Sequence, residues 1–550
     1  MKRFIYIKRK IVSDNFLYFV ALFLLLAFRS PMDLITPYLW AEDGTVLIRE
    51  SVYEGLSIIA KQGNGAYWVI QRIFGLVCYW LVKPFGSIEA LPYIMQVLSK
   101  SLNVLSVMYF MSDRFSWLVS EKKYRFGICA GIILLMSQYA NDTLTCDTSL
   151  PFGLFFGVFL IGLDLLCEHK YEFISTMQTV FLTLMALSIA SAPCIGVLVG
   201  VIAIQWIFYH RKDRLKKKTW FSFGIKICFV WSAVAIQTYC VLMSERSGSE
   251  WDLFHRLLLN TKSFMFFPYW NQFHSWTAFF CGLSIWAVIL YMGRISWKVV
   301  MYSGGFSYLY MLYCSMADQA ENAFAGTMVA RYVFTCFQIA AFMLGIAIIY
   351  LLSQKSKLKK YMAYSIGMSL AILALRTYDI PVLDAQIADS YKIYSGLFDE
   401  KGKDRVWIPI GPYRPWKFDI PAEISMQPMK SDLEFGVERL DNKLTGTEEF
   451  GCLSDNSNWE ISGWATTSTK NQVFKRLLIK NKSYYIATTE LTIREIFQDE
   501  QRTHNGFRFT VTNDATLCFK DGTTKLEIVG QTEDGVWHSG ILDIPTILPK

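Results

Sequence analysis

Two adjacent carboxylates, Glu42 and Asp43, lie in the segment 40–44 (WAEDG), directly beyond the first long apolar run of the chain. That run, residues 16–36, is long enough to cross a bilayer. Basic residues hold its amino end in the cytoplasm by the positive-inside rule; they are Lys2, Arg3, Lys8, Arg9 and Lys10. The acidic pair is therefore expected at the outer membrane surface, where a carboxylate can take a proton from a hydroxyl group. The alternative is a solvated loop acid beside a turn glycine.

A second polar loop, residues 141–149, holds two acids and four hydroxyl side chains between apolar runs. Either Asp142 or Asp147 could orient an acceptor, share a proton or hold a divalent cation opposite the first pair. The sequence leaves metal use unknown and indicates no other cofactor. A loop of this polarity can also simply be solvated.

Cations and aromatic residues gather in two further segments. The loop 244–275 is rich in Trp, Tyr and Phe, and its polar residues include His255, Arg256 and His274. These suit a lipid-phosphate headgroup and its sugar, or an ordinary interfacial belt. Arg331, followed by Tyr332, begins a span at the outer boundary, where it could clamp a phosphate bidentately or serve as a snorkelling anchor.

The composition is that of a membrane protein. Of 550 residues, 53% are hydrophobic and only 18% are charged, whereas soluble domains carry about 25% charged residues. The net charge of +8 is concentrated in short basic loops, so it indicates topology and lipid contact rather than nucleic-acid binding. The 12 cysteines are scattered without a Cys-x-x-Cys pair, which argues against a zinc or redox site. Walker, Rossmann and His-Glu-x-x-His motifs are missing, so nucleotide hydrolysis, dinucleotide binding and zinc proteolysis lose support.

About 11 membrane spans are expected, with the amino end inside and everything after about residue 379 outside. The segment 66–82 is apolar but contains Gln71 and Arg72, and the basic loops are all cytoplasmic only if it does not cross. We interpret it as an interfacial helix within a long first outer loop, residues 37–90. The expected spans are 16–36, 91–111, 125–140, 150–168, 173–190, 194–209, 220–243, 276–291, 298–314, 331–352 and 361–378.

Beyond the helical region, 1–378, the apolar runs fall to strand length. Residues 379–444 form a linker or the start of an extracytoplasmic region, and 445–550 are expected to fold as a β-sandwich. A disulfide between Cys452 and Cys518 stays open. The expected strands are 473–480, 483–489, 507–512, 525–530 and 536–542.

Taken together, the first span, the acidic pair, the second acidic loop and the late Arg-Tyr resemble the polytopic GT-C glycosyltransferases. These include the dolichyl-phosphate-mannose protein mannosyltransferases and the aminoarabinose transferase of lipid A. The segment 40–44 resembles the opening of bacterial members of that class, and the segments 459–465 and 505–509 are similar to a β-domain on bacterial surface glycosyltransferases. The resemblance implies a GT-C-like polytopic α-helical membrane protein followed by an extracytoplasmic all-β sandwich.

This resemblance also implies a function. The protein would be an inverting enzyme of the cytoplasmic (inner) membrane that moves a sugar from a polyprenyl-phosphate donor to an envelope glycan or lipid acceptor. Asp43 would be the general base, with Glu42 beside it, and Asp142 or Asp147 would occupy the second acidic position. The alternatives are a polysaccharide or lipid transporter, or flippase, in which the acids relay protons or bind substrate, and a surface-anchored protein whose sandwich holds glycan.

Overall fold

The chain divides into two compact units in a computed structural model. Unit 1 comprises residues 1–34, 57–74 and 96–381, and unit 2 comprises 35–56, 75–95 and 382–550. Each unit is therefore assembled from segments that are distant in the sequence. The structure describes residues 2–35, 37, 39, 43–63, 65–134, 150–189, 191–211, 217–243, 295–314, 334–376, 385–410, 417–442, 459–467, 472–481, 484–488, 490–494, 504–511 and 525–543.

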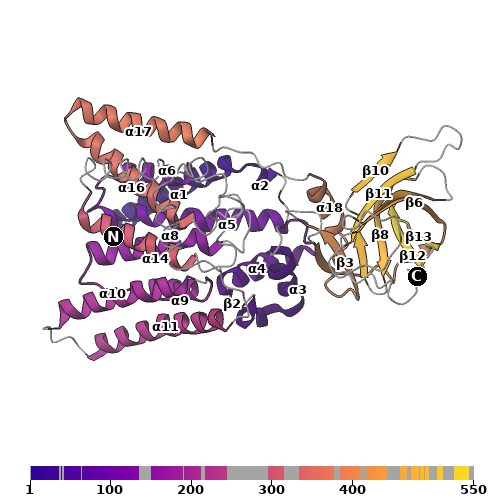
Figure 1. Cartoon of the computed structure of the whole chain (residues 1–550), viewed down its shortest axis with the longest axis horizontal. Helices are drawn as coiled ribbons and strands as arrows, with labels where there is room; N and C mark the ends of the chain where they lie inside the picture. The colour runs from indigo at the N-terminus through magenta and orange to yellow at the C-terminus, as the bar shows by residue number, and fades with distance from the viewer. Residues whose placement is uncertain are drawn as a thin grey trace. The chain divides into compact units, whose positions relative to one another are not determined.

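Unit 1 is a bundle of helices (Figure 1). Five helical segments in the described part of the chain are long and apolar enough to cross a membrane: Leu91–Met111, Leu150–Cys167, Ala192–His210, Lys218–Leu242 and Phe334–Ser353. The described parts of the other expected spans are largely helical, whereas the expected span 276–291 lies outside the described residues. The long helices are α1 (Lys2–Arg29), α5 (Leu91–Met108), α6 (Lys122–Leu134), α8 (Leu150–Cys167), α9 (Thr176–Ala186), α10 (Ala192–His210), α11 (Lys217–Leu242), α14 (Trp297–Cys314), α16 (Phe334–Ser353) and α17 (Lys357–Arg376).

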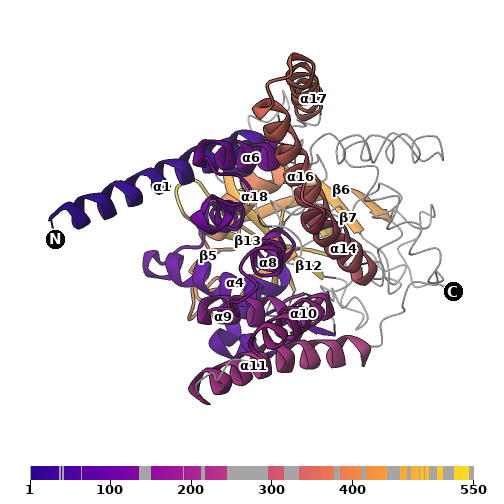
Figure 2. The same cartoon turned by 90° about the vertical axis from the view of Figure 1, so that its left-hand side faces the viewer.

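Helix α8 is the centre of the bundle. Figure 2 shows it among α10, α14 and α16, each of which contacts it. Apart from Asp164 near its end, its sequence is apolar on every side, as expected for a helix buried all round. Phe159 packs against Phe306 of α14 and Phe342 of α16, and the Tyr302 hydroxyl donates to the Phe159 carbonyl at 2.8 Å.

One face of α5 is polar and buried. Gln96, Ser99, Lys100, Asn103 and Ser106 recur at helical spacing, and all lie inside the bundle. The Lys100 ammonium donates to the Ser30 hydroxyl at 3.0 Å. Because burial of polar groups costs free energy, packing alone does not explain why these residues are polar.

The two polar residues in the segment 66–82 are buried within unit 1. This segment forms helix α4 (Val69–Val82). The Gln71 amide donates to the Ser188 carbonyl at 3.0 Å, and Arg72 Nη1 donates to the Ile58 carbonyl at 3.0 Å. These hydrogen bonds satisfy some of the polar side-chain atoms of Gln71 and Arg72, the two residues that make this segment unusual for a membrane span.

An ionic network joins the end of α8 to the connection before α6. Asp164 is fully buried, with Arg114 Nε 2.5 Å from one carboxylate oxygen and His169 Nδ1 2.6 Å from the other. Arg114 also contacts Glu172 at 2.8 Å, but Glu172 is exposed. Asp164 therefore holds two neighbouring segments through one buried charge.

Unit 2 combines residues 35–56 and 75–95 with the C-terminal region. Lys83 Nζ lies 2.5 Å from Glu400, and the Tyr391 hydroxyl donates to the Ile88 carbonyl at 2.8 Å. The shorter helices of the chain are α2 (Met32–Ile35), η1 (Asp43–Ile48), α3 (Arg49–Glu54), η2 (Gly55–Ala60), η3 (Lys83–Phe85), η4 (Tyr109–Met111), η5 (Asp113–Phe115) and α18 (Ala385–Ser395). A two-stranded hairpin, β1 (Gln62–Gly63) and β2 (Ala66–Tyr67), belongs to unit 1.

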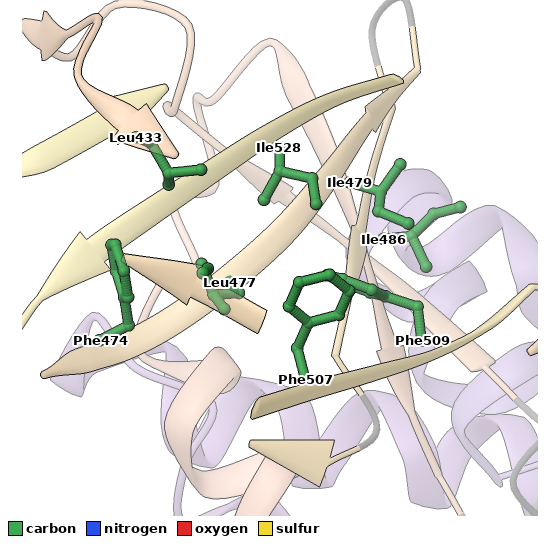
Figure 3. Packing of buried hydrophobic residues seen from close by; sticks show 9 residues of the cluster. Leu433, Phe474, Leu477, Ile479, Ile486, Phe507, Phe509 and Ile528 are labelled. Carbon is green, nitrogen blue, oxygen red and sulfur yellow. The ribbon is translucent and has the colours of Figure 1, made fainter. Parts of the chain in front are cut away.

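The C-terminal region contains two sheets that share one hydrophobic core. The larger has the order β4-β3-β9-β8-β12-β13-β5, and the smaller β10-β11-β7-β6. Alternate residues of β8 and β11, such as Leu477 with Ile479 and Phe507 with Phe509, meet in this core (Figure 3). The strands are β3 (Asp404–Pro409), β4 (Lys417–Ala422), β5 (Met429–Lys430), β6 (Leu433–Asn442), β7 (Trp459–Thr467), β8 (Phe474–Asn481), β9 (Tyr484–Ala487), β10 (Glu490–Arg494), β11 (His504–Val511), β12 (Lys525–Thr532) and β13 (Trp537–Asp543).

The prediction of a β-sheet region in the C-terminal part is confirmed. The five expected strands correspond to β8, β9, β11, β12 and β13. Strands β3 to β6 lie within 379–444, the segment interpreted from the sequence as a linker or the start of the outer region. Cys452 and Cys518 lie outside the described residues, so a disulfide between them stays a prediction.

Candidate active site

Asp43 is the first residue of η1, a π-helix, and its side chain is 1% exposed. Irregular π-helical turns are frequent at functional sites. The neighbouring Leu47 and Ile48 are fully buried, so the helix is fixed through its apolar side. The carboxylate is thus held on a packed element of unit 2 and not in a solvated loop.

Gly44 allows η1 to approach the C-terminal region closely. A Cβ atom there would lie 2.6 Å from Ile410 Cδ1 and 3.3 Å from Phe418 Cβ. Its φ angle is outside the left-handed region, so the turn glycine expected from the sequence is not what the structure shows. Close packing against the strands, and not backbone freedom, explains a glycine beside Asp43.

The other side of η1 is held by helix α4. Gly75 of α4 approaches Leu47, where an added Cβ would lie 3.3 Å from the Leu47 carbonyl oxygen. The Ser51 hydroxyl donates to that same carbonyl at 2.6 Å. Asp43 therefore begins a short helix that is packed against both α4 and β4.

A buried carboxylate joins α3 to β4. Asp419 is 0% exposed, and its Oδ1 lies 2.5 Å from Arg49 Nε, while its Oδ2 lies 3.7 Å from Arg405 Nη1. The Tyr53 phenol faces the same carboxylate. Burial raises the pKa of Asp419, and the charges of Arg49 and Arg405 offset part of that rise. Burial also raises the pKa of Tyr53, helped by the negative charge of Asp419, so the phenol stays protonated at neutral pH.

Aromatic rings flank both arginines. The Arg405 guanidinium lies 5.0 Å from the Tyr53 ring centroid and 5.8 Å from that of Tyr484. Arg49 lies 6.0 Å from the Trp407 ring centroid. These distances are within the range of cation–π attraction, which fixes the planes of the two guanidinium groups.

Of the site residues expected from the sequence, the structure describes Asp43. Eight others lie outside the described residues: Glu42, Asp142, Asp147, His255, Arg256, His274, Arg331 and Tyr332. Among the residues that are described, no group of three or more His, Cys, Asp or Glu side chains could hold a metal ion. The divalent cation considered with Asp142 and Asp147 stays a prediction.

Sequence reasoning missed the cluster around Asp419. One signal was available, since Asp419 interrupts an apolar strand between Phe418 and Ile420. A charge in a buried strand needs a partner. Arg405 and Trp407 also alternate along β3, which places them on one face, but nothing in the pattern pointed to Arg49.

No protein-family model matches this chain, and a comparison with curated proteins found no match either. The class of protein is defined by the fold alone: several apolar helices compatible with a membrane protein, and a separate β-sheet region in the C-terminal part. The function is therefore inferred from the chemistry of the site residues.

Proposed function

We propose that this protein is a membrane glycosyltransferase that moves a sugar, with inversion, from a polyprenyl-phosphate donor to an envelope glycan or lipid acceptor. The reaction takes place on the outer face of the cytoplasmic membrane. The observation that carries the proposal is Asp43, a carboxylate that follows the first apolar helix and is fixed inside unit 2 by η1. Exclusion of water around such a group strengthens its electrostatic interactions with a substrate.

In the proposed mechanism, Asp43 accepts the proton of an acceptor hydroxyl group. The hydroxyl oxygen forms a bond to the anomeric carbon as the bond from that carbon to the phosphate oxygen breaks. The polyprenyl phosphate leaves with the electron pair, and Arg331 with Tyr332 and the loop residues His255, Arg256 and His274 stabilise its charge. Asp142 or Asp147 orients the acceptor.

The composition of unit 2 supports an outer location for the C-terminal region. Residues 35–56 and 75–95 pack with residues 382–550 in one compact unit. Because loops on opposite sides of a bilayer cannot pack together, we infer that these segments lie on the same side. The positive-inside rule puts the first outer loop outside. The C-terminal region then lies outside with it, on the side where polyprenyl-linked donors are used in the proposed reaction.

Cysteine labelling in intact cells tests this topology. Glu54→Cys on α3 and Glu423→Cys after β4 change exposed residues, and we expect both to react with a membrane-impermeant maleimide from outside. Lys355→Cys, between α16 and α17, should react only after the cells are opened. The parent protein controls for its exposed Cys228. Labelling of Glu54→Cys only in opened cells would overturn the assignment of the active site.

Arg331 provides a test of donor binding. If its guanidinium clamps the phosphate with two parallel hydrogen bonds, Arg331→Lys should weaken transfer at least about tenfold, because a point ammonium cannot reproduce the fork. The measurement is the KM for the polyprenyl-phosphate donor. A lysine variant with wild-type kinetics would leave Arg331 as a membrane anchor.

The proposed function itself is tested by transfer with the purified protein. Radiolabelled sugar on a polyprenyl-phosphate carrier should appear on envelope extract from a deletion strain, and mass spectrometry should find that sugar missing from the strain's own envelope. A strain whose envelope glycans match the parent in composition, together with inactive purified protein, would sink the proposal.

A transporter is the second candidate, and the buried polar face of α5 favours it. Lys100 and Asn103 lie inside the helical bundle, where a substrate path or a proton relay would run. This candidate requires movement of an intact lipid-linked glycan across vesicles, without breakage of its sugar–phosphate bond. Such movement without sugar transfer would favour the transporter.

A further inference from the structure

Arg49, Tyr53, Arg405, Trp407 and Tyr484 form one surface of unit 2, which we call the arginine–aromatic site. Each arginine side chain is 42% exposed, and Asp419 beneath them is fully buried. Tyr53 and Tyr484 are exposed, and Trp407 is half-buried. The site is therefore open to solvent above a buried anion.

The two arginines keep most of their hydrogen-bonding capacity. A guanidinium group has five N–H donors, and Arg49 approaches Asp419 through Nε. Arg405 Nη1 is 3.7 Å from Asp419, which is beyond hydrogen-bond distance. Two positive charges thus face one negative charge. The remaining N–H groups are available to donate hydrogen bonds to an anion from solution.

The aromatic rings add a second kind of recognition. They hold the guanidinium planes in place at 5.0–6.0 Å, which lowers the entropy that a ligand must remove. The exposed faces of Tyr53 and Tyr484 can also stack on the apolar face of a sugar ring. An arginine pair combined with exposed rings suits a sugar that carries a phosphate or a carboxylate.

The position of the site relative to Asp43 suggests which substrate it binds. Arg49 follows Asp43 by six residues through η1, and because a π-helix rises less per residue than the 1.5 Å of an α-helix, the two are separated by less than about 9 Å along the helix axis. A short oligosaccharide spans that distance. We propose that the arginine–aromatic site binds an anionic sugar of the acceptor glycan; the assignment to the acceptor, but not the binding itself, rests on the proposed function.

Binding to the full-length protein in neutral nanodiscs tests this proposal. The probes are a tetramer of galacturonic acid, its methyl-esterified neutral form, and mannose 6-phosphate, with titration calorimetry as the readout. We expect at least one of the two anionic probes to bind and the neutral ester to bind at least about tenfold more weakly, since charged hydrogen bonds are lost. Measurable binding of the tetramer and its ester with equal affinity, or failure of both anionic probes to bind, would overturn the proposal.

Matched variants locate the binding. Arg405→Gln should weaken binding of the anionic probe by about tenfold to a hundredfold, and Tyr484→Ala should also weaken it. Lys403→Gln removes an exposed positive charge just before β3, outside the site, and should change affinity less than about twofold. Thermal unfolding should be similar in Tyr484→Ala and Lys403→Gln, because these side chains are exposed. In Arg405→Gln we expect a small loss of stability, because the buried Asp419 keeps Arg49 at 2.5 Å but loses its second positive charge at 3.7 Å. Equal losses of affinity in Arg405→Gln and Lys403→Gln would show that the probe binds through general surface charge and not at this site.

Two further measurements are needed. One distinguishes a lipid headgroup from a sugar as the anion, and the other distinguishes failure of this site from failure of the proposed function. Flotation with phosphatidylglycerol vesicles tests a lipid headgroup, and Arg405-dependent binding to vesicles without binding to the sugars would contradict the glycan assignment. If Asp43→Asn transferred sugar normally, the catalytic proposal would fail, while a loss of binding in Arg405→Gln would still support this site.

Discussion

Sugar transfer is expected to fall by about two to four orders of magnitude when Asp43 is replaced with Asn, because acid–base assistance is removed. The amide has the same shape as the carboxylate, so the packing of η1 against Ile410 and Phe418 should persist. The measurement is the single-turnover rate with a polyprenyl-phosphate donor, at saturating acceptor. Limited proteolysis should give the wild-type pattern.

Glu42→Gln is the matched control for Asp43→Asn. It makes the same chemical change one residue earlier, and we expect a smaller loss of rate. If Asp43→Asn transferred sugar at the wild-type rate, Asp43 would not be the base, and the transporter would become the better candidate. If the Asn variant unfolded, transfer by Asp43→Glu would show whether a carboxylate at this position is sufficient.

The second large effect is expected on stability. Arg114→Met removes one partner of the buried Asp164 and should lower the free energy of unfolding by about 3 kcal/mol, because a buried charge is left with less compensation. The value is at the low end for such a change, since His169 stays 2.6 Å away and Arg114 is 34% exposed. Thermal unfolding in detergent, with denaturant titration of the variants, would measure the loss.

Glu172→Gln provides the control for this stability effect. It removes the other carboxylate that contacts Arg114, but Glu172 is exposed, so we expect a loss under about 1 kcal/mol. The difference between the two variants isolates the contribution of burial. Similar stability in both would show that Asp164 does not depend on Arg114.

Hydrophobic pattern predicted the elements well because it reflects local geometry. Leu477 with Ile479 and Phe507 with Phe509 alternate along their strands, and all four lie in the core between the sheets. The pattern shows which face of a strand is buried, but not which strand it pairs with. The hydrophobic pattern therefore could not predict the parallel pairing of β3 with β9, which brings Arg405 beside Tyr484.

The candidate site was harder to predict for the same reason. Asp43 could be chosen from its place after an apolar run, but Ile410 and Phe418, which pack against the adjacent Gly44, come from the far end of the chain. The alternative of a turn at Gly44 could therefore not be rejected from the sequence. The pairing of Arg49 with Asp419 likewise joins two segments that no local pattern relates.

The division of unit 2 along the chain has a consequence for biosynthesis. The segment that carries Asp43 and Arg49 leaves the ribosome early, whereas its packing partners β3 and β4 follow only after all of Gln96–Pro381. At about 5–20 residues per second, this interval lasts roughly 15 to 60 s. During that time η1 lacks strand β4, against which it later packs. Until the C-terminal strands are synthesised, the nascent first loop is thus free to bind chaperones or the bilayer surface.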